Sequence, residues 1–153
     1  MRIRIVEAVV IGAVGFGLSP AAHAKARLER VDVSGGDLAR TASLTDQKIL
    51  DLANPWHGEL AAWTAAPIAA PAPDLVVYEV TMHARARSGE MKAIYRVRYA
   101  PGTDGRAGAV YLPGKGESGH RQNVSTISRS GQDGHWLPAT PEWDAHLSQI
   151  LAR

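Results

Sequence analysis

The sequence predicts an α+β domain: an antiparallel β-meander of about five strands with N-terminal helices and a C-terminal helix packed on one face. Two alternating stretches, 74–87 and 90–99, flank a Ser-Gly pair and predict a long β-hairpin. Helix signals occur before this hairpin, within 43–66, and again after a Thr-Pro pair near the end of the sequence. Helices that are separated in sequence from the strands are typical of an antiparallel sheet with helices on one face.

The first 24 residues predict a secretory signal peptide that is not part of this domain. Two arginines precede the apolar stretch 5–18, which ends in small residues with an expected cleavage site after Ala24. A spanning helix needs about 20 apolar residues, and this stretch is shorter. We therefore expect 1–24 to be removed and 25–153 to work as a single domain in the periplasm or outside the cell.

The segment 25–37 alternates weakly and predicts a short strand or an ordered arm. Ser43 or Thr45 is suited to cap a first helix, which an Asn-Pro pair ends after Ala53.

A second short helix is predicted by the i, i+4, i+7 spacing of Trp56, Leu60 and Trp63. It must end before Pro67, where a proline- and alanine-rich stretch predicts an extended connector. The expected organisation follows the chain as helical part 43–66, connector 67–73, β-meander 74–138 and terminal helix 141–152.

In the hairpin, a two-residue loop would place Tyr78 opposite Tyr99 and Arg85 opposite Lys92. One face then carries apolar side chains from both strands, and the other carries polar and basic ones. A slip of one residue would bury the charges, so the pattern specifies the register strongly.

The rest of the meander is predicted as strand 107–112, mobile loop 113–119, strand 121–129 and short strand 135–137, with turns between them. The terminal helix is expected to start at Pro141, which follows a threonine cap.

Several kinds of chemistry are excluded or unsupported. The chain has no cysteine, so disulfides, Cys-ligated zinc and thiol catalysis are impossible. The glycine-rich stretch around Lys115 lacks the P-loop spacing, and no histidines have the spacing of a helical zinc site. We therefore expect no metal and no cofactor. Asn123 begins a formal glycosylation sequon, which we interpret as an ordinary strand position.

The net charge is only +2, yet basic side chains clearly outnumber acidic ones within 80–129. This asymmetry favours a non-enzymatic binding module whose polar sheet face contacts an anionic envelope component or protein, such as a lipid head group, an acidic glycan or an acidic protein surface. Nucleic acid is not expected as a partner of an exported protein. The candidate ligand-binding residues are Arg85, Lys92, Arg96, Arg98 and Lys115.

The alternative is a small extracytoplasmic hydrolase that uses His120 or His135 with a nearby acid or serine. His83 is a separate case. Its expected position among basic side chains should lower its pKa and favour the neutral imidazole.

Overall fold

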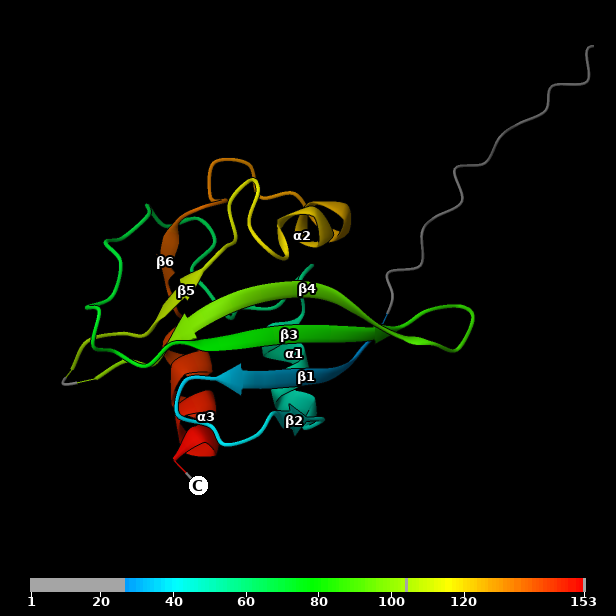
Figure 1. Cartoon of the computed structure of the whole chain (residues 1–153), viewed down its shortest axis with the longest axis horizontal. Helices are drawn as coiled ribbons and strands as arrows, with labels where there is room; N and C mark the ends of the chain where they lie inside the picture. Colours follow the sequence, from blue (N-terminus) through cyan, green and yellow to red (C-terminus); the bar gives the residue numbers. More distant parts are fainter. Residues whose placement is uncertain (1–26, 104, 153) are drawn as a thin grey trace, which may run out of the picture.

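A six-stranded antiparallel sheet lies at the centre of the computed structural model, which describes residues 27–103 and 105–152 (Figure 1). The signal peptide predicted over 1–24 lies outside these residues. The strand order is β2-β1-β3-β4-β5-β6, and each neighbouring pair is antiparallel. The strands are β1 (Leu28–Gly35), β2 (Ala42–Leu44), β3 (Tyr78–Arg85), β4 (Met91–Ala100), β5 (Ala109–Tyr111) and β6 (Trp136–Pro138).

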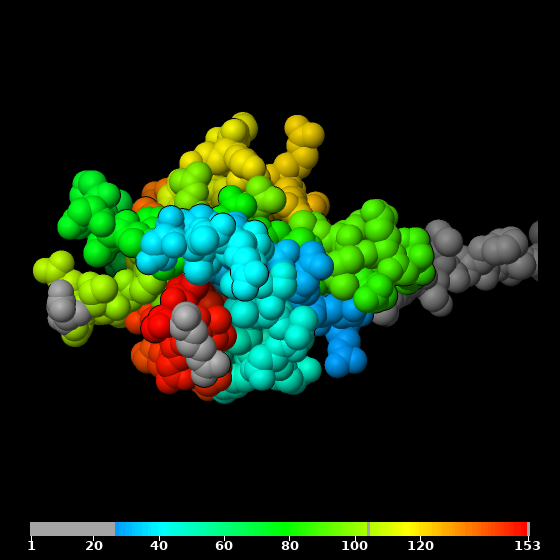
Figure 2. Space-filling view, turned by 60° about the horizontal axis from the view of Figure 1, so that its bottom comes forward, coloured from blue at the N-terminus to red at the C-terminus, as the bar shows by residue number. Residues whose placement is uncertain are grey.

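The part of the chain that the structure describes also contains three helices, α1 (Gln47–Ala53), α2 (His120–Thr126) and α3 (Pro141–Leu151). In Figure 1, α1 and α3 lie behind β1 and β3, whereas α2 lies beyond β4 on the side away from β3. Figure 2 views the molecule from the helix side and shows α3 beside α1. The predicted α+β class with an antiparallel sheet is therefore confirmed, with one helix at an unexpected place.

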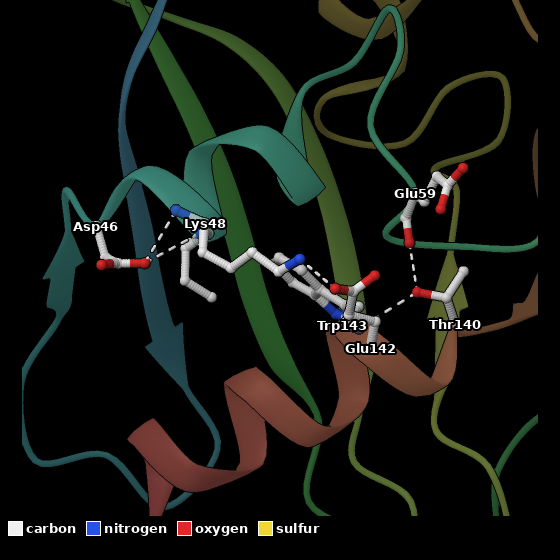
Figure 3. Close-up of polar contacts among 7 residues, drawn as sticks. Asp46, Lys48, Glu59, Thr140, Glu142 and Trp143 are labelled. Carbon is white, nitrogen blue, oxygen red and sulfur yellow. Dashed lines mark hydrogen bonds and ion pairs between the residues drawn. The ribbon is translucent and has the colours of Figure 1, made fainter.

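The starts of α1 and α3 are fixed by side-chain caps (Figure 3). Asp46 Oδ1 accepts hydrogen bonds from the backbone N–H groups of Lys48, at 3.0 Å, and Ile49, at 3.3 Å. The cap of α1 is thus Asp46 and neither of the two hydroxyl residues expected from the sequence. Thr140 Oγ1 caps α3 by accepting from the Trp143 N–H at 3.3 Å, as the Thr-Pro pair predicts.

The core fills the space between the sheet and the two helices α1 and α3. Trp143 of α3 and Tyr99 of β4 are both fully buried and meet edge to face, with ring centroids 6.0 Å apart. The other large, fully buried side chains are Val31, Val33, Ile49, Leu60, Val80, Met82, Tyr95, Leu112, Leu137 and Leu147.

Asp144 of α3 ties the terminal helix to the connection between β4 and β5. Its carboxylate accepts from the Gly102 N–H at 3.0 Å, from the Gly108 N–H at 3.2 Å and from the Tyr99 hydroxyl. A Cβ atom at either glycine would collide with this carboxylate, so both positions require glycine.

The predicted hairpin register is correct from Tyr78 to Met82 and wrong by one residue beyond that point. The loop is longer than two residues, because the Ala86 N–H donates to the Glu90 carbonyl at 2.8 Å and closes a three-residue loop. The register shift between Met82 and His83 accommodates the extra residue as a β-bulge in β4. Arg85 consequently lies opposite Met91, so the predicted Arg85–Lys92 pair does not form.

Two predicted elements are wrong. The segment expected as strand 121–129 contains the helix α2, and the helix expected around Trp56 and Trp63 is a series of turns. The indole N–H groups there bond separately, from Trp56 to the Thr126 carbonyl at 3.3 Å and from Trp63 to the Gly58 carbonyl at 3.0 Å. The helix-like spacing of Trp56 and Trp63 therefore results from separate contacts of each side chain and not from a helix.

Candidate functional site

Four basic side chains of the hairpin are paired with carboxylates. The ion pairs are Arg85–Glu29 at 2.8 Å, Lys92–Glu90 at 3.3 Å, Arg96–Glu79 at 3.6 Å and Arg98–Glu117 at 3.9 Å. The candidate ligand-binding residues of the hairpin are thus each close to a carboxylate. The pairs differ in how strongly each cation is held, and this difference decides which of the candidate residues can bind a ligand.

Arg85 is fully engaged within the fold. Its Nε and Nη2 donate to Glu29 of β1 at 2.8–3.2 Å, and its Nη1 donates to the Gly89 carbonyl at 2.8 Å. The sequence did not indicate that β1 pairs with β3, so this carboxylate was missed. Lys92 is exposed near the same end of the hairpin. Figures 1 and 2 show this end projecting from the body of the molecule.

Arg96 and Arg98 instead converge on the loop 113–119. Arg96 Nη1 donates to Ser118 Oγ at 3.2 Å, and the missing Cβ of Gly119 lets the loop lie directly against the Arg96 side chain. The Arg98 guanidinium lies 3.9 Å from Glu117 Oε1 and makes no hydrogen bond to a described residue. Lys115 is exposed on the same loop. The structure therefore places Arg96 and Arg98 against the loop that carries Lys115, whereas Arg85 and Lys92 lie toward the projecting end of the hairpin.

Glu117 organises the loop 113–119. Its Oε2 accepts from the Gly114 N–H at 2.5 Å and from the Tyr111 hydroxyl at 2.7 Å. These two hydrogen bonds, in that order of importance, hold the pKa of Glu117 below its usual range, with a smaller contribution from Arg98. The carboxylate is thus used in closing the loop.

A row of two aromatic rings begins beside Arg98. In the register, Arg98 of β4 faces Tyr111 of β5, which faces Trp136 of β6. The guanidinium carbon of Arg98 lies 5.3 Å from the Tyr111 ring centroid, and the Tyr111 and Trp136 rings are 5.2 Å apart. We call the surface formed by Arg96, Arg98, Tyr111, Lys115 and Trp136 the loop-side patch. Neither Tyr111 nor Trp136 is among the residues predicted from the sequence, because their position beside Arg98 depends on strand pairing.

The helix α2 holds Arg96, which lies in the part of β4 that extends beyond its pairing with β5. The Asn123 side chain accepts from the Arg96 N–H at 2.8 Å and donates to the Arg96 carbonyl at 2.7 Å. Thr126 donates similarly to the Ile94 carbonyl. Asn123 is only 2% exposed. The sequon asparagine is therefore a buried helix residue that bonds the sheet edge, which corrects its interpretation as a strand position.

The histidines form no catalytic constellation among the described residues. His120 Nε2 lies 3.7 Å from Asp133 Oδ2, and no serine hydroxyl in the described part of the chain bonds to His120 or His135. His135 is exposed. In residues 27–103 and 105–152 no group of three or more histidines or carboxylates is placed to hold a metal ion.

His83 lies with its Nε2 atom 2.9 Å from Asp32 Oδ2. Burial lowers the pKa of His83, Arg30 and Arg96 lower it further, and Asp32 partly opposes them. The predicted direction is correct, but burial is the main cause.

A groove of about 660 Å³ lies between the connector and the loop that joins β4 to β5. Its walls are mostly small apolar side chains, with Asp74 and Arg106 as the charged residues among those that line it. It contains none of the candidate residues.

Comparisons with known protein families, with curated proteins and with solved structures find no match to this chain.

Proposed function

We propose that the protein is an exported, non-enzymatic binding module that holds an anionic partner on the loop-side patch. The observation that carries this proposal is the state of Arg98. Its side chain is 47% exposed and makes no hydrogen bond to a described residue, so its N–H donors are available to a ligand.

The glutamates beside the patch do not prevent this binding. The closest atoms of the Arg98–Glu117 pair are 3.9 Å apart, and exposed ion pairs of this kind contribute only about 0–1 kcal/mol. Replacing such a contact by a bidentate hydrogen-bonded anion costs little. Arg85 is the opposite case, because a ligand would have to displace three hydrogen bonds to Glu29.

Export is the second part of the proposal and rests on the signal peptide predicted over 1–24, with a periplasmic or secreted product. The described residues contain no helix of sufficient length and apolar character to cross a membrane. The hydrolase alternative rests on the pair of His120 and Asp133 alone, whose 3.7 Å separation exceeds hydrogen-bonding distance.

The test is salt elution of the exported form from immobilised dextran sulfate. Arg98→Ser and Lys115→Ser should each elute at lower salt than the parent protein, because each removes a charge that contacts the polyanion. Lys92→Ser is the matched control, since it removes the same charge from the far end of β4. If all three variants shift equally, net charge explains retention and the loop-side patch is not the binding site.

A further inference from the structure

The loop-side patch combines charge with flat aromatic surface. Arg98, Tyr111 and Trp136 face one another across three neighbouring strands. Strands are about 4.8 Å apart, so the set extends over about 10 Å. This is the length of two linked pyranose rings. The set therefore matches a short piece of a ring-bearing polymer better than a single small anion.

The free donors of the patch are distributed along this length. Tyr111 uses its hydroxyl to hold Glu117 and so offers only its ring. Trp136 makes no side-chain hydrogen bond to a described residue, which leaves its indole N–H and part of its ring for a partner. Arg98 supplies a planar fork that fits a carboxylate.

Two other anionic partners fit the surroundings less well. Membrane insertion requires a cluster of exposed apolar side chains, and of the large ones among the described residues, Ile68, Val76 and Val124, Ile68 alone is paired with a patch residue, Trp136. An acidic peptide that adds as a strand requires an open edge. The Ile68 N–H already donates to the Trp136 carbonyl on β6 at 2.8 Å, and Asn123 covers Arg96 on β4.

We propose that the loop-side patch binds an acidic polysaccharide, with a uronic acid carboxylate held by Arg98 and a neighbouring sugar ring packed on Trp136. This inference rests on the proposed function and specifies its partner class. Lys115 lies on the adjoining loop and would meet a further carboxylate along the chain. The chemistry is recognition of a repeating carboxylate on a pyranose chain, without any covalent step.

The experiment is calorimetric titration of the exported protein with a short oligogalacturonate and with its methyl ester, which masks the carboxylates. The acid should bind, and the ester should bind about tenfold more weakly or worse, because esterification removes the charged acceptor of the Arg98 guanidinium. Arg98→Ser should weaken binding of the acid by about tenfold, whereas Lys92→Ser should change it less than twofold. In the parent protein, the NMR signal of the Trp136 indole N–H should shift on titration, which needs no variant that risks misfolding.

Equal binding of acid and ester, or an unshifted Trp136 signal, would overturn the glycan assignment. Polyglutamate and phosphatidylglycerol vesicles separate this failure from failure of the proposed function. If either of them binds in an Arg98-dependent way and oligogalacturonate does not, the partner class is wrong and the anion site remains. If no probe binds in an Arg98-dependent way, both proposals fail.

Discussion

Replacing Asn123 by alanine is expected to destabilise the fold far more than its position in a short surface helix suggests. The change removes hydrogen bonds of 2.8 and 2.7 Å and leaves both backbone groups of Arg96 without their partner. An unsatisfied buried polar group costs about 1–3 kcal/mol. Arg96 would have two such groups. The substitution should therefore lower the free energy of unfolding by about 3 kcal/mol, which corresponds to a fall of roughly 10 °C in melting temperature.

Urea unfolding followed by circular dichroism measures this difference. Val124→Ala is the matched control, because Val124 is the next residue of α2, is 40% exposed, and should change stability by no more than about 0.5 kcal/mol. Asn123→Asp keeps the side-chain volume and the acceptor but loses the donor to the Arg96 carbonyl. A loss under about 1 kcal/mol for both Asn123 variants would refute the argument, since it would mean that water satisfies the edge of β4 equally well.

Two further predictions concern the close approach of Asp144 to Gly108 and the titration of Tyr78. Gly108→Ala should lower the free energy of unfolding by about 2–3 kcal/mol in urea, because the new Cβ displaces Asp144; Gly89→Ala, with open space around it, should cost only about 1 kcal/mol for its positive φ. Equal effects would contradict the steric argument. Burial and the hydrogen bond to Asp37 raise the pKa of Tyr78 to about 12, so stability should fall as pH rises from about 10 toward that value, because the unfolded chain releases this proton first. Tyr78→Phe should show a smaller fall than the parent, and identical pH curves would contradict this assignment.

The fold class and half of the hairpin register were predictable because the apolar pattern is strong there. Val80 and Val97 must point into the core, and a slipped register would bury charge. The three-residue loop was not predictable, because it depends on a bulge in β4 that the apolar pattern does not show. Beyond this bulge Lys92, and not Ala93, lies opposite Ala84.

The helix α2 was not predictable because its sequence carries no apolar periodicity, and valine, serine and threonine do not favour helices. Contacts of Asn123 and Thr126 with β4 select the helix instead. The same limit applies to the loop-side patch. Arg96, Arg98 and Lys115 could be named from charge, but their grouping around Glu117 depends on strand pairs that are distant in sequence.

The contacts of Asp144 also determine when the molecule can finish folding. They join the last helix to backbone groups 42 and 36 residues earlier, so the N–H groups of Gly102 and Gly108 lack their native acceptor until α3 docks. Contacts of such long range close late and slowly. We expect docking of the terminal helix to be a late event of folding, and a chain that ends before Asp144 to leave the Tyr99 hydroxyl and the Gly102 and Gly108 N–H groups without this acceptor.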